Sequence, residues 1–122
     1  MMERVMITEE DLAQQFTLII EQAHPEAWEI LRRCYIKVLN SRSKGAYIAH
    51  TKYIRIYCPD RLLSAVVAEK NLLIEVAEYL GLVEVVCLNA TNLLHDPKSQ
   101  IEKVYPQLWL DLMWIVTQDK QL

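Results

Sequence analysis

The residues best suited to chemistry lie near the centre of the chain, in "YIRIYCPDRLL", residues 53–63. Cys58 precedes Pro59 there, and Asp60 and Arg61 follow. A cysteine acts as a nucleophile or metal ligand when it is a thiolate, and a nearby arginine or helix N-terminus favours that form. One interpretation is therefore a catalytic thiol, or a haem or metal ligand. In the other, Cys58 is a small buried residue at a strand end, Pro59 stops the strand and Asp60 caps the next helix.

The surroundings of the cysteine favour the structural interpretation. No histidine and no second cysteine lies close to Cys58 in the sequence, and His24, His50 and His95 form no metal-binding pattern. Two glycines far apart provide no phosphate-binding loop, and no pair of acids suggests proton-transfer chemistry. We therefore predict no catalytic residue, no metal and no cofactor, and a protein that is not an enzyme.

A second candidate is the basic segment around this motif. Although the net charge is −3, residues 32–61 contain a single acid, Asp60, and four of the six tyrosines. The basic residues of this segment are Arg32, Arg33, Lys37, Arg42, Lys44, Lys52, Arg55 and Arg61. Such a composition fits two interpretations, a solvated face whose tyrosines pack in the core, or a surface for single-stranded nucleic acid.

Strand parity places part of this segment on one face. Tyr53, Arg55 and Tyr57 alternate with aliphatic residues, so they point to the side of the strand opposite the apolar one. Bases can stack on tyrosines, and lysine or arginine can contact phosphates. The predicted nucleic-acid-binding residues are Arg42, Lys44, Lys52, Tyr53, Arg55 and Tyr57. Because the rest of the chain is acidic, we expect this binding to be weak and sensitive to salt.

The pattern of apolar residues predicts the elements that position these side chains. Helical spacing predicts helices over 8–24, 26–39 and 60–80, with Gly81 as the C-cap of the last, and further helices from Pro97 and Pro106. Residues 46–50 and 52–58 read as a hairpin, and 82–90 as a third strand. The predicted fold class is therefore α+β, with a small three-stranded sheet packed by helices and extra C-terminal helices.

Length and composition set the remaining expectations. At 122 residues with 52% apolar residues, the chain is expected to form a single domain, 1–122. We expect no signal peptide and no membrane segment, because no apolar run approaches 18 residues. Three cysteines without a Cys-x-x-Cys pair favour a reducing, cytoplasmic location.

The last helix, "PQLWLDLMWIVTQ", is apolar nearly all round and contains Trp109 and Trp114. It is too short to span a bilayer, so it is either central to the core or lies against another chain. In a domain of this size the helix can belong to the core and also contact another chain, and contact with a second copy would make the protein a homodimer.

Two segments resemble the N-terminal domain of the bacterial replication initiator DnaA. They are "LAQQFTLIIEQAHPEAW" and "IRIYCPDRLLSAVVAEKNLLIEVAEYLG", the second resembling that family's strand, Pro-Asp turn and long helix. The resemblance implies a KH-like fold that self-associates, recruits replication partners and sometimes binds single-stranded DNA weakly. Arg61 and Leu62 match the family's partner-contacting helix start. The KH Gly-x-x-Gly loop is missing, so RNA binding of the ordinary KH kind is not implied.

Two functional hypotheses follow. The first is a cytoplasmic docking domain for protein partners that are not identified, linked to DNA replication or another DNA transaction. It would self-associate and use Arg61, Leu62, Trp109 and Trp114 as partner-binding residues. The alternative is a weak single-stranded nucleic-acid-binding protein that uses the basic segment 32–61.

Overall fold

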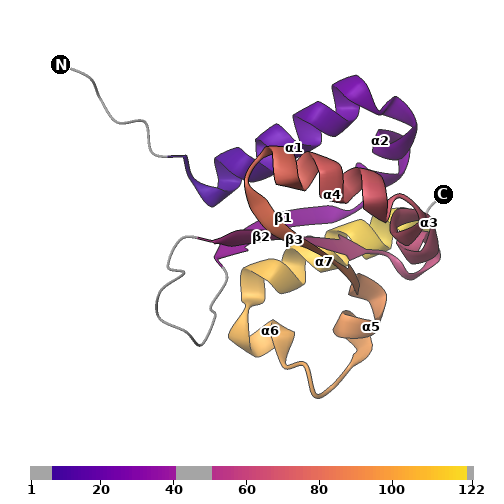
Figure 1. Ribbon diagram of the computed structural model, residues 1–122. Coiled ribbons are helices and arrows are strands. Elements are labelled where there is room, and N and C mark those ends of the chain that lie inside the picture. The colour runs from indigo at the N-terminus through magenta and orange to yellow at the C-terminus, as the bar shows by residue number, and fades with distance from the viewer. Residues whose placement is uncertain (1–6, 41–50, 121–122) are drawn as a thin grey trace.

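The computed structural model describes residues 7–40 and 51–120, which form a three-stranded sheet between two groups of helices (Figure 1). The strands are β1 (Tyr35–Asn40), β2 (Lys52–Cys58) and β3 (Leu82–Asn89). The helices are α1 (Glu9–Ala23), α2 (Pro25–Leu31), the 3-10 turn η1 (Asp60–Leu62), α3 (Leu63–Ala68), α4 (Lys70–Tyr79), α5 (Ala90–His95), α6 (Ile101–Val104) and α7 (Pro106–Lys120). The predicted α+β class with extra C-terminal helices is therefore confirmed.

The sheet is mixed, in the order β1-β2-β3. β1 pairs with β2 in antiparallel register, and β2 pairs with β3 in parallel register. A parallel pair requires a crossover, which η1, α3 and α4 provide. As a result β2 is the central strand, and β1 and β3 are the two edges.

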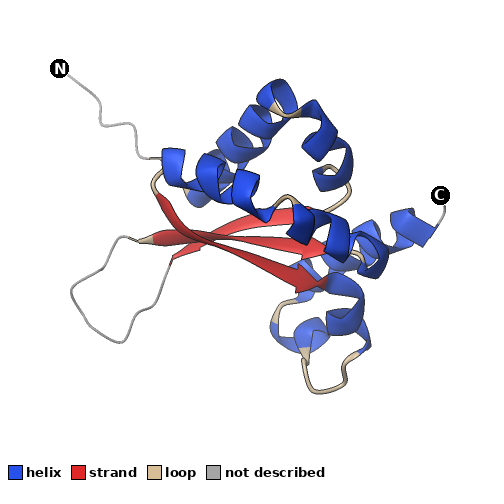
Figure 2. Ribbon diagram, turned by 45° about the vertical axis from the view of Figure 1, so that its right-hand side comes forward, coloured by secondary structure: helices blue, strands red, loops and turns tan. Residues whose placement is uncertain are grey.

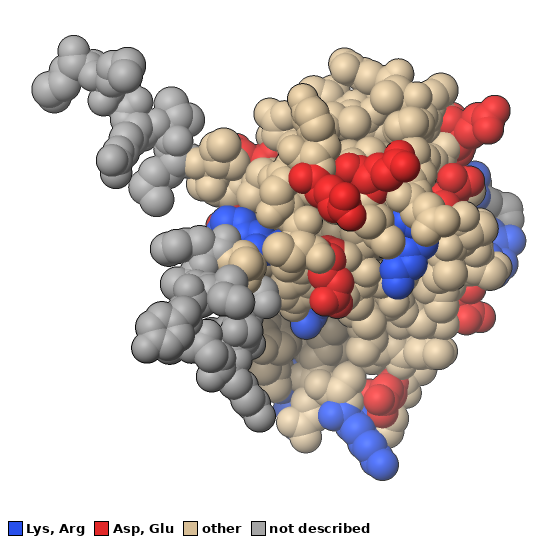
Figure 3. Space-filling view, viewed as in Figure 1, with Lys and Arg blue, Asp and Glu red and all other residues tan. Residues whose placement is uncertain are grey.

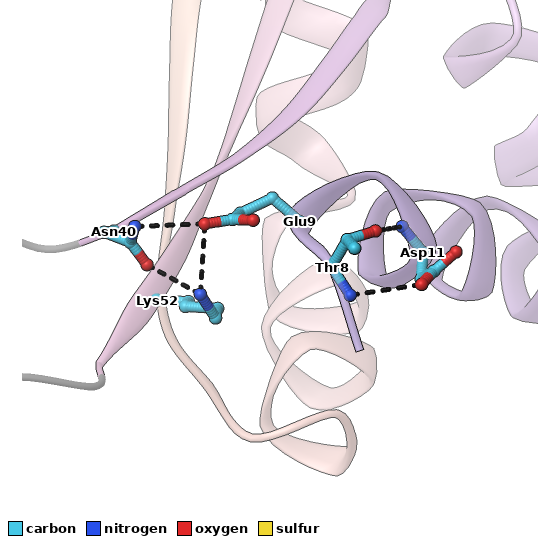
Figure 4. Close-up of polar contacts among 5 residues, drawn as sticks. All are labelled: Thr8, Glu9, Asp11, Asn40 and Lys52. Carbon is cyan, nitrogen blue, oxygen red and sulfur yellow. Dashed lines mark hydrogen bonds and ion pairs between the residues drawn. The ribbon is translucent and has the colours of Figure 1, made fainter. Parts of the chain in front are cut away.

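The first helix begins where the sequence predicted. Thr8 Oγ1 accepts a hydrogen bond from the Asp11 amide at 3.1 Å, and the Asp11 carboxylate accepts one from the Thr8 amide at 3.1 Å (Figure 4). This capping box satisfies two amides that the first turn leaves without a helical partner. The helix ends at Ala23 with His24 as its C-cap, and Pro25 then opens α2.

One face of the sheet packs against α1 to α4 and forms the larger core. Its strand residues are aliphatic or cysteine, and Ile54, Ile56 and Cys58 of β2 are fully buried. From the helices, Phe16, Ile20 and further apolar residues fill the same core. The period of two along β2 therefore produces one continuous apolar face.

The other face carries a smaller core beneath the C-terminal helices. This core consists of Tyr57, Ala90, Ile101, Leu112 and Val116, with partly buried apolar residues around them. Figure 2 shows that these helices lie under the end of the sheet toward which β2 and β3 point. Among the described residues, the second layer thus covers one half of this face and leaves the other half open.

The position of the first strand differs from the prediction. Residues 35–39 were expected to continue a helix, but the helix ends at Leu31 and Tyr35–Asn40 forms β1. Alternation of Ile36 and Val38 with Lys37 fits a strand as well as a helix, and pairing with β2 decides between them. The hairpin strand expected at 46–50 lies outside the described residues.

Two expected helices also differ. The helix over 60–80 is divided, because α3 ends at Ala68 and α4 begins at Lys70. Asp60 does not cap it; its carboxylate instead accepts a hydrogen bond from Asn89 Nδ2 at 2.8 Å. The segment after β3 forms α5, whereas no helix begins at Pro97.

α4 ends at Tyr79 with Leu80 as its C-cap, so Gly81, the predicted C-cap, lies one residue further along, and its backbone conformation gives a test. Its φ of +80° lies in the left-handed region, and a Cβ there would meet no atom within 4 Å. We expect Gly81→Ala to lower the free energy of unfolding by about 1–2 kcal/mol through backbone strain alone. Gly81→Asn should cost less, since asparagine tolerates this region. Equal urea midpoints for Gly81→Ala and the parent would contradict this account.

Candidate functional site

The second sheet face carries three rows of side chains that cross the strands. The covered row, beneath α7, is Tyr35, Tyr57 and Leu88. The cationic row is Lys37, Arg55 and Val86. In the outer row, Leu39 lies opposite Tyr53, and a register shift places both Val83 and Glu84 beside it. Apart from Tyr35, the residues of these rows form the floor of a groove.

This sheet groove has a volume of about 730 Å³ and mixed chemistry. Tyr105 and Leu108, from the junction of α6 and α7, form its wall on the side of the second core. The lining residues are Lys37, Leu39, Asn40, Tyr53, Arg55, Tyr57, Val83, Glu84, Val86, Leu88, Tyr105 and Leu108. A cavity of this size lies within the range of small-ligand and peptide sites.

Arg55 is held in a defined orientation on the groove floor. Its guanidinium carbon lies 5.4 Å from the centroid of the Tyr53 ring, and Nη1 donates a hydrogen bond to Tyr57 Oη at 3.2 Å. A cation over an aromatic face and a hydrogen bond to a buried tyrosine both restrict the rotamer. The predicted proximity of Tyr53, Arg55 and Tyr57 on one face is therefore present.

Tyr57 requires a correction. It was predicted to be an exposed stacking platform, but the residue is 2% exposed and belongs to the second core. Parity correctly placed it opposite the aliphatic face, yet the C-terminal helices cover that position. No base can reach this ring, so its contribution to the groove is the hydroxyl that orients Arg55.

Lys52 lies on the opposite face from Arg55 and contacts α1. Its ammonium group forms an ion pair with Glu9 Oε1 at 3.2 Å and donates to Asn40 Oδ1 at 2.6 Å (Figure 4). The pKa of Glu9 is lowered, first by its own backbone hydrogen bond and then by Lys52. Lys52 therefore connects β2 to the N-terminal helix. Arg42 and Lys44 lie outside the described residues.

Arg61 also has an intramolecular partner. Its Nε and Nη2 donate to the two carboxylate oxygens of Asp119, both at 3.0 Å, and Nη2 also donates to the Asp119 carbonyl at 3.2 Å. Asp119 is 6% exposed, whereas the Arg61 side chain is 60% exposed. This pair attaches the end of α7 to η1. Leu62, the other predicted docking residue, is half-buried.

The two tryptophans of α7 have different surroundings. Trp109 packs partly buried against the second core, while Trp114 is 66% exposed. Leu110 and Met113 are exposed beside Trp114 at helical spacing. We call Leu110, Met113 and Trp114 the α7 outer face.

Cys58 is surrounded by apolar groups and by another thiol. Its residue is fully buried, and Sγ donates weakly to the Ile56 carbonyl at 3.5 Å. A hydrogen bond with the Cys34 thiol and then burial raise the pKa of Cys58 far above its usual value. Burial also raises the pKa of Cys87. A thiol with a raised pKa is a poor nucleophile at neutral pH.

Sequence reasoning missed Lys37, Val86 and Tyr105 as groove residues. Lys37 has the same parity as Tyr35 and Leu39, which would place it on the groove face of a strand. The prediction missed it because residues 26–39 were expected to form a helix. Tyr105 enters the groove through the placement of α6 and α7, which no local pattern indicates.

Comparisons with known proteins add no assignment, since no family model, curated protein or solved structure matches the chain. Within residues 7–40 and 51–120, no group of three or more His, Cys, Asp or Glu side chains is arranged to bind a metal. No helix in the described part of the chain is long and apolar enough to cross a membrane.

The Arg61–Asp119 pair predicts a pH-dependent contribution to stability. Arg61 holds the pKa of Asp119 below its ordinary value of 3.8. The stabilisation is therefore present above about pH 4 and is lost as the pH falls through the lowered pKa of the folded state. We expect Asp119→Asn to reduce the free energy of unfolding at pH 7, because the neutral amide loses the ion pair with Arg61. In urea titrations, the difference in unfolding free energy between Asp119→Asn and the parent should narrow below pH 3.8, the ordinary pKa of an aspartate. Glu102→Gln, at an exposed acid of α6, is the control, and a pH-independent difference would refute the assignment.

The burial of Cys58 predicts slow chemical modification. In a Cys34→Ala/Cys87→Ala background, native Cys58 should react with Ellman's reagent at pH 8 more than about tenfold slower than in urea. Absorbance at the thionitrobenzoate maximum follows the reaction. Rapid labelling of the folded protein would reopen the catalytic-thiol interpretation.

Proposed function

We propose that this protein is a non-enzymatic docking domain that self-associates through the α7 outer face. The supporting observation is a helix with two apolar sides. Its inner side, with Leu112 and Val116, is buried in the second core, while Leu110, Met113 and Trp114 are exposed. Exposed apolar groups gathered on one side of a helix are typical of interaction surfaces.

The position of α7 is fixed without a partner, which favours a preformed interface. Inner side chains anchor the helix along its length, and the Asp119–Arg61 pair holds its end. Such a helix loses little conformational entropy when a second surface covers it. Self-association therefore requires no rearrangement of the domain.

The charge distribution on α7 favours a second copy as the partner. Its exposed side chains between Gln107 and Gln118 are Gln107, Leu110, Met113, Trp114, Thr117 and Gln118, and none of them is charged. In a two-fold symmetric interface the same patch meets itself, so a charge close to the axis would face its own copy. An uncharged stripe with a central tryptophan avoids that repulsion and provides a typical interface anchor.

The resemblance to the DnaA N-terminal domain supports docking only by analogy of architecture. That family self-associates and recruits replication proteins, which agrees with a docking role linked to a DNA transaction. For single-strand binding, three observations are unfavourable: Tyr57 is buried, Lys52 is paired with Glu9, and Glu84 lines the groove. Acidic side chains also gather on the helical layer around α4 (Figure 3).

Sedimentation equilibrium tests the self-association. We expect the parent protein to be a dimer at micromolar concentrations and Trp114→Glu to weaken dimerisation by about a hundredfold or more, because a central hot-spot residue becomes charged. Tyr79→Glu is the matched control, since Tyr79 is 81% exposed on α4, away from this face. Circular dichroism checks that each variant is folded. The proposal would be wrong if the parent protein is a monomer, or if Trp114→Glu dimerises with the same dissociation constant as the parent.

A further inference from the structure

We propose that the sheet groove binds an extended peptide segment of a partner protein, with one acidic side chain held between Lys37 and Arg55 and apolar side chains on both sides of it. This site is distinct from the α7 outer face. It adds a second partner to the docking function and does not depend on the oligomeric state.

The charge of the groove matches a single carboxylate. Its charged lining residues are Lys37, Arg55 and Glu84, which together give a net charge of +1. Within the described residues, neither Lys37 nor Arg55 has a carboxylate within 4.0 Å, although Lys52 and Arg61 each do. In the described part of the domain, the two cations of the floor therefore form no ion pair, and Glu84 balances only one of their two charges.

The placement of the two cations favours one anionic group over a chain of phosphates. Lys37 and Arg55 are direct partners across the β1–β2 pair, so their Cβ atoms lie only about 5 Å apart. Both side chains can reach the same carboxylate. Single-stranded nucleic acid instead follows a path of cations and stacking rings, and here one ring of the predicted set is buried.

Arg55 is oriented in advance for a carboxylate. The Tyr53 ring and the Tyr57 hydroxyl restrict its guanidinium, and Tyr57 is itself fixed in the second core. The bond to Tyr57 uses one of five N–H donors, and a bidentate carboxylate needs two more. Since the rotamer is already restricted, little side-chain entropy is lost on binding.

Apolar residues lie on both sides of the cationic row. Leu88 and Leu108 are on the side of the second core, and Leu39 and Val83 are on the outer side. Val83 is 59% exposed and Tyr105 is 62% exposed, so both offer accessible contact area. An acidic residue between apolar ones would place its carboxylate on the cations and its neighbours on these surfaces. A free organic acid would fill only one side of this arrangement.

A displayed library of random 12-residue peptides tests the inference, using the monomeric Trp114→Glu protein as well as the parent. We expect selected peptides to carry an Asp or Glu flanked by apolar or aromatic residues. Fluorescence anisotropy should then show binding weakened about tenfold or more by Lys37→Met, or by Asn or Gln in place of the peptide acid. Lys37→Arg should restore most of the affinity.

Lys103→Met is the matched control, since this lysine is exposed on α6 and does not line the groove. Recovery of no peptides, or of peptides whose affinity is unchanged by Lys37→Met, would overturn the proposal. So would tighter, Lys37-dependent binding of a 12-nucleotide oligothymidylate, which would assign the groove to nucleic acid. Each of these outcomes is independent of dimerisation, because it is also measured on the Trp114→Glu protein.

Discussion

The burial of Tyr57 between β2 and the C-terminal helices is the contact on which both candidate surfaces depend. It belongs to the second core, so it attaches α5 and α7 to a sheet face that would otherwise be solvated. Its hydroxyl also orients Arg55, the most restricted cation of the groove. A single side chain thus joins the packing of the second layer to the chemistry of the open half of the sheet.

The same packing determines the two sides of α7. Because the inner side of this helix covers the row Tyr35, Tyr57 and Leu88, its opposite side is directed outward. Tyr35 is half-buried in this layer, where burial and then the nearby Asp111 raise its pKa to about 12. The groove wall at Leu108 and the exposed face at Trp114 are therefore two consequences of one helix placement.

Local patterns in the sequence predicted much of this fold. The helix predicted over 8–24 begins after Thr8, and the helix predicted up to residue 80 ends just before Gly81, because residues close in sequence determine both ends. Alternation also assigned Tyr53 and Arg55 to one face of β2. By contrast, β1 depends on pairing with a strand far along the chain, and its residues satisfy a helical pattern equally well. The covering of Tyr57 depends on tertiary packing, which parity cannot reveal.

The basic segment shows why composition alone does not define an electrostatic surface. Eight basic residues between positions 32 and 61 look like one electrostatic surface in the sequence. In the fold, Arg32 pairs with Glu29, Lys52 with Glu9 and Arg61 with Asp119. The first is a local helix contact, and the other two attach distant helices to the sheet region. Three of the eight basic residues of the segment are therefore paired with acids elsewhere in the chain. What distinguishes Lys37 and Arg55 is their position, side by side on an open sheet face, with apolar surface around them and a buried tyrosine beneath.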